Sequence, residues 1–261
     1  MNMACEKPSI KKSTSPSYSY AIFNNMFWST VESSLQYAAT GWMNDGGYSW
    51  SGFGGAALGG FLGGVIPGYQ AVPGGSMVNI FSETAYSAAR GGVLGYVGGG
   101  LGEVLRTGSW NNEAAISGAG YGVLGGVISS TVKIGLLGYA VPKSDFQKEI
   151  EANYAKEHNL IIGPYGSVNR RGGLLDVVGV SIGRNNVSNP EKKRMLTAPT
   201  HEGIHYLQQV KDGTLPFYLR VAQEYKFGTD MKSAYTKVGT YDYEADDYSL
   251  DYYYTGKKAY H

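Results

Sequence analysis

Apolar residues in the first half of the chain surround three glycine zippers, in which glycine recurs at every fourth position. The zippers are Gly55, Gly59 and Gly63, then Gly91, Gly95 and Gly99, then Gly118, Gly122 and Gly126. Each pattern predicts an apolar helix whose glycine face admits a close neighbour. Because a glycine costs about 1 kcal/mol of helix propensity relative to alanine, packing between these helices must stabilise them.

The second half shows an amphipathic pattern over 198–211, where Ile204, Leu207 and Val210 recur at helical spacing. Pro199 suits the first turn of such a helix, with Thr197 as its cap. The Asp-Gly pair at 212–213 is typical of a helix end. We therefore expect a helix with one buried side.

A shorter run of β-branched residues over 174–182 predicts a strand, and the residues 183–186 are expected to break it. Such a strand, directly before the predicted helix, could bind an extended peptide through main-chain hydrogen bonds.

Composition changes near Pro142. Residues 1–141 hold 28 of the 39 glycines but 12 charged side chains, whereas 142–261 hold 11 glycines and 31 charges. We therefore divide the chain into a glycine-rich helical region, 1–141, and a small domain, 142–261. The fold class expected is α+β and mostly helical, with helical hairpins followed by a domain of few strands.

The predicted helix carries the pattern H-E-x-x-H at His201, Glu202 and His205. Positions i and i+4 share a helical face, so both imidazoles can bind one metal ion, and Glu202 lies close enough to act on a metal-bound water. The residues predict two ligands and a general base within little more than one turn.

A catalytic zinc site needs a third protein ligand. The acidic segment 241–248 could supply it from a second helix, and we favour Glu244 as that ligand. Asp247 or Asp251 could instead orient a ligand histidine through its other ring nitrogen. Tyr248 and its neighbouring tyrosines are candidate donors to a tetrahedral oxyanion.

These segments resemble the zincin group of zinc metallopeptidases, and more narrowly gluzincin-like bacterial domains in which the motif runs into Gln208-Gln209. The resemblance covers residues 143–261 and implies Zn²⁺, hydrolysis of peptide bonds, His201 and His205 as ligands and Glu202 as base. Two departures leave the subfamily open. Tyr248 stands where the thermolysin-like pattern has an Asp four residues after the ligand Glu, and Lys211 stands where metzincins have a third His.

Residues 20–141 resemble, by composition, the region that precedes the toxin in bacterial polymorphic toxins, particularly Rhs-type effectors. That resemblance implies delivery into a target cell by a secretion apparatus or a larger carrier protein, and a cognate immunity protein. No cleavable signal peptide is expected from the first twenty residues.

Two other functions remain open. The helical region could insert into or cross membranes, although only 114–141 approaches the length of a spanning segment. Alternatively, the metal site could be structural, without turnover. The net charge of +1 gives no indication of nucleic-acid binding.

Overall fold

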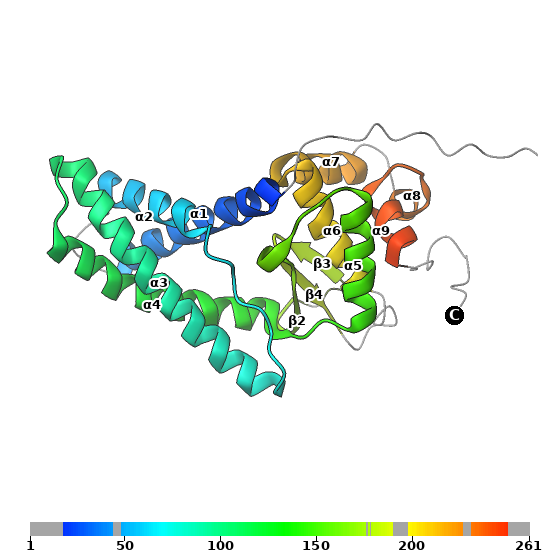
Figure 1. Ribbon diagram of the computed structural model, residues 1–261, viewed down its shortest axis with the longest axis horizontal. Coiled ribbons are helices and arrows are strands. Elements are labelled where there is room, and N and C mark those ends of the chain that lie inside the picture. The colour runs from blue at the N-terminus through cyan, green and yellow to red at the C-terminus, as the bar shows by residue number, and fades with distance from the viewer. Residues whose placement is uncertain are drawn as a thin grey trace, which may run out of the picture.

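A computed structural model describes residues 18–43, 48–175, 177, 179–189, 198–226 and 231–249 (Figure 1). The helical region contains α1 (Tyr18–Met43), α2 (Trp50–Gly63), α3 (Gly75–Thr107) and α4 (Asn112–Leu137). The rest of the chain adds β1 (Gly138–Val141), α5 (Asp145–Glu157), the 3-10 turn η1 (Gly163–Tyr165), β2 (Val168–Gly172), β3 (Gly179–Ile182), β4 (Asn185–Ser188), α6 (Ala198–Asp212), α7 (Thr214–Lys226), α8 (Met231–Thr236) and α9 (Tyr241–Ser249). The fold is mostly helical α+β with a small mixed sheet, as predicted.

The glycine zippers pack helix against helix as their spacing predicts. A Cβ added to Gly95 on α3 would lie 2.0 Å from the carbonyl oxygen of Gly118 on α4, and one added to Gly122 would lie 2.0 Å from that of Gly91. The first zipper meets α3 in the same way, because a Cβ on Gly55 would lie 2.4 Å from the Gly98 oxygen. Backbones at this separation leave no room for a side chain.

The sheet has the order β1-β2-β4-β3. The outer pairs β1–β2 and β3–β4 are antiparallel, and the central pair β2–β4 is parallel. The strand predicted over 174–182 is shorter in the structure, where β3 covers only its end. The break predicted over 183–186 is only two residues long, because Gly183 (φ +56°) and Arg184 form the turn between paired Ile182 and Asn185. Asn185 and its neighbour continue as β4, where β2 supplies partners for their polar side chains.

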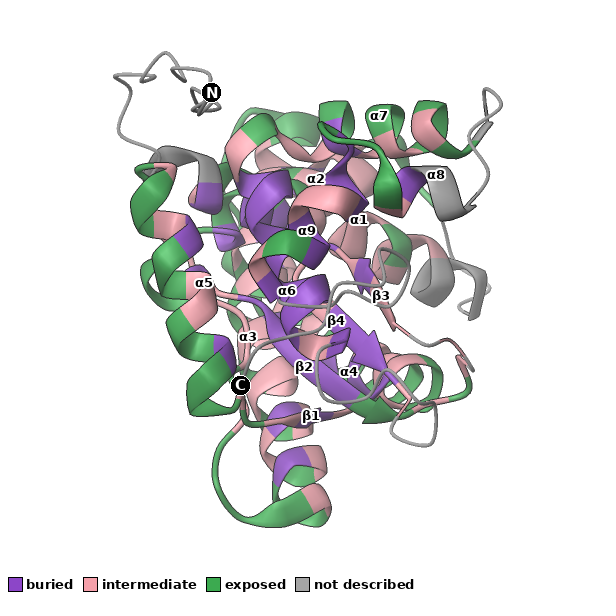
Figure 2. Ribbon diagram, turned by 90° about the vertical axis from the view of Figure 1, so that its right-hand side faces the viewer, coloured by how far each residue is buried: buried purple, intermediate pink, exposed green. Residues whose placement is uncertain are grey.

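Helix α6 lies at the centre of the second half, against α5, α7, α9 and the strands β3 and β4 (Figure 2). Its apolar residues Ile204, Leu207 and Val210 are buried as predicted and form a core with Tyr154 of α5. The helix ends where the sequence predicts, since Gly213 adopts φ +90°. The predicted cap, Thr197, lies outside the described residues.

The two halves are tied together across the predicted boundary at Pro142. Strand β1 precedes that boundary and yet forms one edge of the sheet. Arg170 of β2 also reaches back to Glu83 of α3, with Nη1 3.1 Å from Oε2 and a second contact from Nη2 to Oε1. Both side chains are almost fully buried. The helical region therefore contributes directly to the surroundings of the sheet.

Candidate metal centre

The H-E-x-x-H residues lie on α6, the most buried helix of the second half. His201 and His205 are one helical turn apart, and their ring centroids are separated by 4.6 Å. Both side chains are largely buried, with relative exposures of 3% and 8%. The structure therefore brings the two predicted ligands together in a sheltered position.

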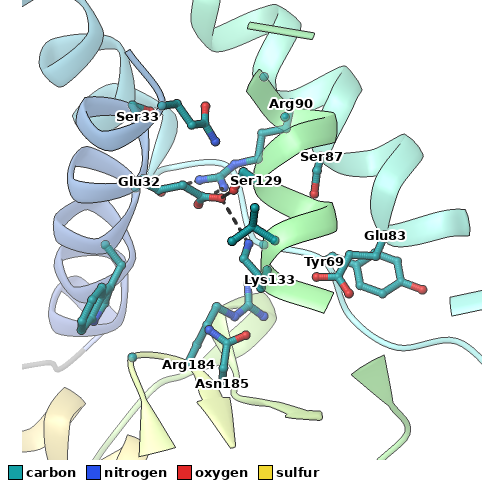
Figure 3. Close-up of a pocket in the computed structure, with 18 of the residues that line it drawn as sticks. Glu32, Ser33, Tyr69, Glu83, Ser87, Arg90, Ser129, Lys133, Arg184 and Asn185 are labelled. Atoms are coloured by element: carbon teal, nitrogen blue, oxygen red, sulfur yellow. Dashed lines mark hydrogen bonds and ion pairs between the residues drawn. The ribbon is translucent and has the colours of Figure 1, made fainter. Parts of the chain in front are cut away.

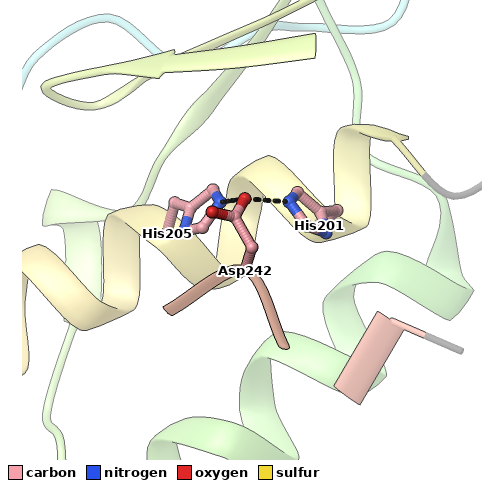
Figure 4. A group of neighbouring side chains, drawn as sticks. All are labelled: His201, His205 and Asp242. Atoms are coloured by element: carbon pink, nitrogen blue, oxygen red, sulfur yellow. Dashed lines mark ion pairs between the residues drawn. The ribbon is translucent and has the colours of Figure 1, made fainter. Parts of the chain in front are cut away.

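A carboxylate from α9 completes this cluster. Oδ1 of Asp242 lies 3.6 Å from Nε2 of His201 and 3.4 Å from Nε2 of His205 (Figure 4). One ligand atom from each of the three residues can lie within 4.8 Å of the other two, so the group could hold a metal ion. Tetrahedral zinc with ligand distances of about 2.0–2.1 Å separates its ligand atoms by about 3.3–3.4 Å. The separations of 3.4 and 3.6 Å lie close to that value.

The third donor in the structure is thus Asp242, whereas the sequence analysis favoured Glu244. Residues two positions apart on a helix point in directions that differ by about 160°. Glu244 therefore faces other partners than Asp242 does. Its Oε1 lies 3.1 Å from Nζ of Lys211, and Tyr154 donates to it at 3.3 Å. Nε2 of His158 lies 3.5 Å from the same atom. Contacts with His158 and Gln208 and the charge of Lys211 lower the pKa of Glu244 to about 2, against the effect of its burial.

The second nitrogen of each imidazole has its own oxygen partner. Oδ1 of Asp246 lies 2.9 Å from Nδ1 of His201, and Oε1 of Gln208 lies 2.7 Å from Nδ1 of His205. Such contacts fix the ring orientation and direct the Nε2 atoms toward a common point. Gln208 in turn donates to Glu244 at 2.9 Å. Glu244 therefore contacts the cluster indirectly, through its hydrogen bond with Gln208.

Charge complementarity shapes the cluster in the absence of a metal ion. Burial alone would lower the pKa of His201, but its contacts with Asp242 and Asp246 raise that pKa to about 10. The pKa of His205 is also raised, against the effect of burial, by Asp242. Despite its own burial, Asp242 has its pKa held far below the usual range by both imidazoles. A metal ion entering this site therefore displaces a proton.

Glu202 lies beside the edge strand of the sheet. A Cβ added to Gly179, the first residue of β3, would lie 2.6 Å from Oε1 of Glu202. The Glu202 side chain is largely buried, at 6% relative exposure. The predicted base thus lies where the motif helix meets β3, an edge strand of the described sheet.

Two tyrosines that the sequence analysis did not select contact the cluster. The hydroxyl of Tyr225 on α7 donates to Oδ2 of Asp242 at 2.8 Å. Burial and the charge of Asp242 raise the pKa of Tyr225, which keeps this hydroxyl protonated. The ring of Tyr235 on α8 stacks on His201 with a centroid distance of 5.7 Å.

The remaining predicted residues lie elsewhere. Tyr248 packs its ring against Tyr154 and His158, at centroid distances of 4.7 and 6.2 Å, on the side of α9 that also carries Glu244. Asp247 is exposed, and Asp251 lies outside the described residues. The carboxylate that orients a ligand histidine is Asp246, one position from the predicted Asp247. The sequence feature that could have identified Asp246 is its spacing of four from Asp242, which places both carboxylates on one face of α9.

No protein-family model, curated protein or solved structure matches the chain. Its function must therefore be argued from the site.

Proposed function

We propose that the chain is a zinc-dependent endopeptidase whose metal site consists of His201, His205 and Asp242. One observation carries the proposal: a single carboxylate oxygen lies 3.4 and 3.6 Å from the two Nε2 atoms of an H-E-x-x-H helix. A site with only a structural role usually has four protein ligands, whereas catalytic zinc usually has three. Three donors meet in the described part of this chain.

The donor set favours zinc among the common divalent ions. Two imidazole nitrogens and one carboxylate oxygen are borderline ligands that suit Zn²⁺, while Mg²⁺ and Ca²⁺ prefer oxygen donors alone. Buried Asp246 and Gln208 add the outer contacts that zinc-binding histidines commonly make.

The roles of the residues follow from their positions. When bound, zinc supplies Lewis-acid polarisation of the scissile carbonyl and lowers the pKa of a coordinated water. Glu202 takes a proton from the attacking water and then passes it to the leaving amine. Tyr225 holds Oδ2 of Asp242 and so leaves Oδ1 directed at the two imidazoles.

Strand β3 suits an extended peptide substrate. It is an edge strand of the described sheet, paired only with β4, and its first residue, Gly179, lies beside the Glu202 carboxylate. A peptide that adds to this edge by main-chain hydrogen bonds would run past the proposed base.

The test compares Glu202→Gln with Glu149→Gln, a control at an exposed position on α5. Both full-length variants are loaded with zinc and incubated with an unfolded protein labelled with a quenched dye. We expect the first to lose at least a hundredfold in cleavage rate at unchanged zinc content, because general acid–base catalysis contributes about 10²–10⁴-fold. The control and wild type should cleave, and a chelator should stop both. Cleavage by Glu202→Gln at the wild-type rate would refute the role of Glu202, and zinc binding without any cleavage would favour a structural site.

We propose further that the peptidase acts as an antibacterial effector delivered into a target cell. The support is the resemblance of residues 20–141 to the region before the toxin in Rhs-type proteins. Expression of the wild-type chain inside a bacterium should then stop growth, and expression of Glu202→Gln should not. If only the wild-type chain stops growth, co-expressed genes that restore growth can be selected as candidates for the immunity protein.

A second candidate function concerns the helical region, because one observation favours membrane contact. Helix α4 alone among the described helices is long and apolar enough to cross a membrane, and only 17% of its most apolar window is buried. Ile116, Leu124 and Val132 on this helix are all more than half exposed. Dye release from anionic liposomes by the full-length chain, abolished in Leu124→Lys and retained in Glu202→Gln, would support this function. Absence of dye release by the wild type would refute it.

A further inference from the structure

A cavity of about 460 Å³ lies between the helical region and the sheet, apart from the metal cluster. Helices α1, α3 and α4 form its walls, and the turn between β3 and β4 closes one end. Four basic side chains line it, Arg90, Lys133, Arg170 and Arg184, and only two acidic ones, Glu32 and Glu83. The cavity is within the range of volumes, about 300–1,000 Å³, that hold small-molecule ligands.

Both carboxylates in this cavity are already paired. Glu83 receives the bidentate contact from Arg170. Glu32 accepts from Ser129 at 2.6 Å and from Lys133 at 3.2 Å. Lys133, Ser129 and Arg90 lower the pKa of Glu32 to about 2 against the effect of its burial, so Glu32 is ionised. The cavity keeps an excess of two positive charges.

Arg184 carries one of these two excess charges, and no carboxylate among the described residues pairs with it. Its Nη2 donates to the carbonyl oxygen of Gly166 at 2.8 Å, but Nε and Nη1 are buried without an acceptor among the described residues. Burial and the like charges of Arg90 and Arg170 lower the pKa of this guanidinium. Figure 3 shows the Arg184 side chain rising from the strands toward Lys133, with Glu32 and Arg90 beyond. A buried guanidinium with free donors is costly unless an anion accepts from it.

Other features of the cavity restrict the ligand. Nε1 of Trp28 is a further buried donor without an acceptor among the described residues. Much of the remaining wall is aliphatic, formed by Leu35, Leu94, Ile128, Val132, Leu136 and Leu137. A small hydrated anion would satisfy Arg184 but leave this aliphatic wall facing water.

We propose that this cavity binds an amphiphilic anion, whose carboxylate or phosphate head accepts from Arg184 and whose apolar chain lies along α4. The buried Nη1 donates to one oxygen of the head group in a charge-assisted hydrogen bond. The apolar chain would cover aliphatic side chains between α1 and α4. The site is separate from the proposed peptidase centre and does not depend on metal binding.

The experiment measures binding of octanoate, octyl phosphate and octanol to the full-length chain by calorimetry and by the fluorescence of Trp28. We expect saturable binding at one site for at least one of the two anions, and weaker binding by tenfold or more for octanol. Preference between octanoate and octyl phosphate then identifies the head group. Inorganic phosphate without a chain should bind at least tenfold more weakly than octyl phosphate. Trp28→Phe identifies the part of the fluorescence signal that comes from the cavity.

Three variants test the role of charge. Arg184→Gln should weaken binding of the anion by about tenfold or more, because it removes a buried positive charge and its charge-assisted hydrogen bond. Arg171→Gln is the matched control, since Arg171 is exposed on β2 outside the cavity. Glu32→Gln should strengthen binding of the anion, because it raises the net positive charge of the cavity while Arg184 stays in place. Circular dichroism and thermal unfolding verify that each variant is folded.

Equal affinities for octanol and the anions, or unchanged anion binding in both Arg184→Gln and Glu32→Gln, would overturn the proposal. If Arg184→Gln does not fold, Glu32→Gln decides.

Discussion

Asp246 Oδ1 lies 2.9 Å from Nδ1 of His201, and Asp242, four residues earlier on α9, faces Nε2 of the same ring at 3.6 Å. Two carboxylates one turn apart on α9 therefore meet two imidazoles one turn apart on α6. Asp242 lies close to both His201 and His205, whereas Asp246 contacts the other nitrogen of His201. The arrangement separates a carboxylate that can bind the metal from one that orients its ligand.

The first prediction concerns the third ligand. Asp242→Ala should lose stoichiometric zinc, because it removes one of three donors. Glu244→Ala should keep the zinc but bind it more weakly, since Glu244 contacts Gln208, which in turn contacts His205. Asp247→Ala, at an exposed position, is the control. Metal analysis by mass spectrometry after dialysis measures the result, and full zinc retention by Asp242→Ala would contradict it.

The second prediction concerns the orienting carboxylate. Asp246→Asn keeps the size of the side chain but removes its charge. We expect zinc affinity to fall by about 10–100-fold, which is typical for such contacts. Competition with a chromophoric chelator measures the affinity. An unchanged value would mean that Asp246 does not support His201.

The third prediction follows from the raised pKa of His201, about 10 in the metal-free protein against 6.5 when unfolded. A pKa raised by folding contributes stability that is complete below pH 6.5 and is lost as the pH rises toward 10. The melting temperature of the metal-free chain should therefore fall between pH 6.5 and 10. The zinc-loaded chain should not show this fall, because its His201 is neutral throughout.

The same proton makes metal binding depend on pH. Over this range zinc affinity should rise by about tenfold per pH unit, since one proton is released on binding. His201→Gln removes the titrating group, and its metal-free form serves as the control. A pH-independent melting temperature of the metal-free wild type would contradict the assignment.

How far the sequence could predict this site is clear from α6 and α9. The approach of His201 and His205 could be predicted because it depends only on spacing within one helix. The third ligand depends on which face of α9 meets α6, and an acidic segment with carboxylates at 242, 244, 246 and 247 fits several rotations. Only packing decides among them. With Glu244 as ligand, the position four residues later is Tyr248, whereas with Asp242 as ligand that position is Asp246.

The fourth prediction tests the glycine zippers with two matched substitutions. Gly95→Ala would place a Cβ 2.0 Å from the Gly118 oxygen, so it should destabilise the chain by about 1–3 kcal/mol. Gly120→Ala on the open face of α4 meets nothing within 4 Å and should stabilise it by about 0.5–1 kcal/mol through helix propensity. Urea denaturation measures both. Equal effects would mean that the close approach of α3 and α4 is wrong.

The fifth prediction concerns the buried pair between the halves. Arg170→Met leaves Glu83 buried without its partner and should cost about 3–5 kcal/mol of stability. The double variant Arg170→Met with Glu83→Leu should recover most of that loss, because no buried charge remains unpaired. Urea denaturation of both single variants and the double variant measures the coupling. Additive losses would show that the two residues do not interact.

The helical region was more predictable than the sheet. Glycine spacing alone identifies faces that allow close packing, and the structure pairs those faces as expected. Strand β1 could not be predicted, because Gly138–Val141 is four residues long and directly continues an apolar helix. Its partner β2 begins 27 residues after β1 ends, and pairings of this kind depend on the tertiary fold.

The direct passage from α4 into β1 has a mechanical consequence. Leu137 ends the helix and Gly138 begins the strand, so no slack lies between them. Tension applied through α4, as during passage through a narrow pore, reaches the edge of the sheet, where β2 is the one strand paired with β1 in the described residues. Unfolding under such tension would begin with β1 at the edge of the sheet, before the force reached His201 and His205 on α6.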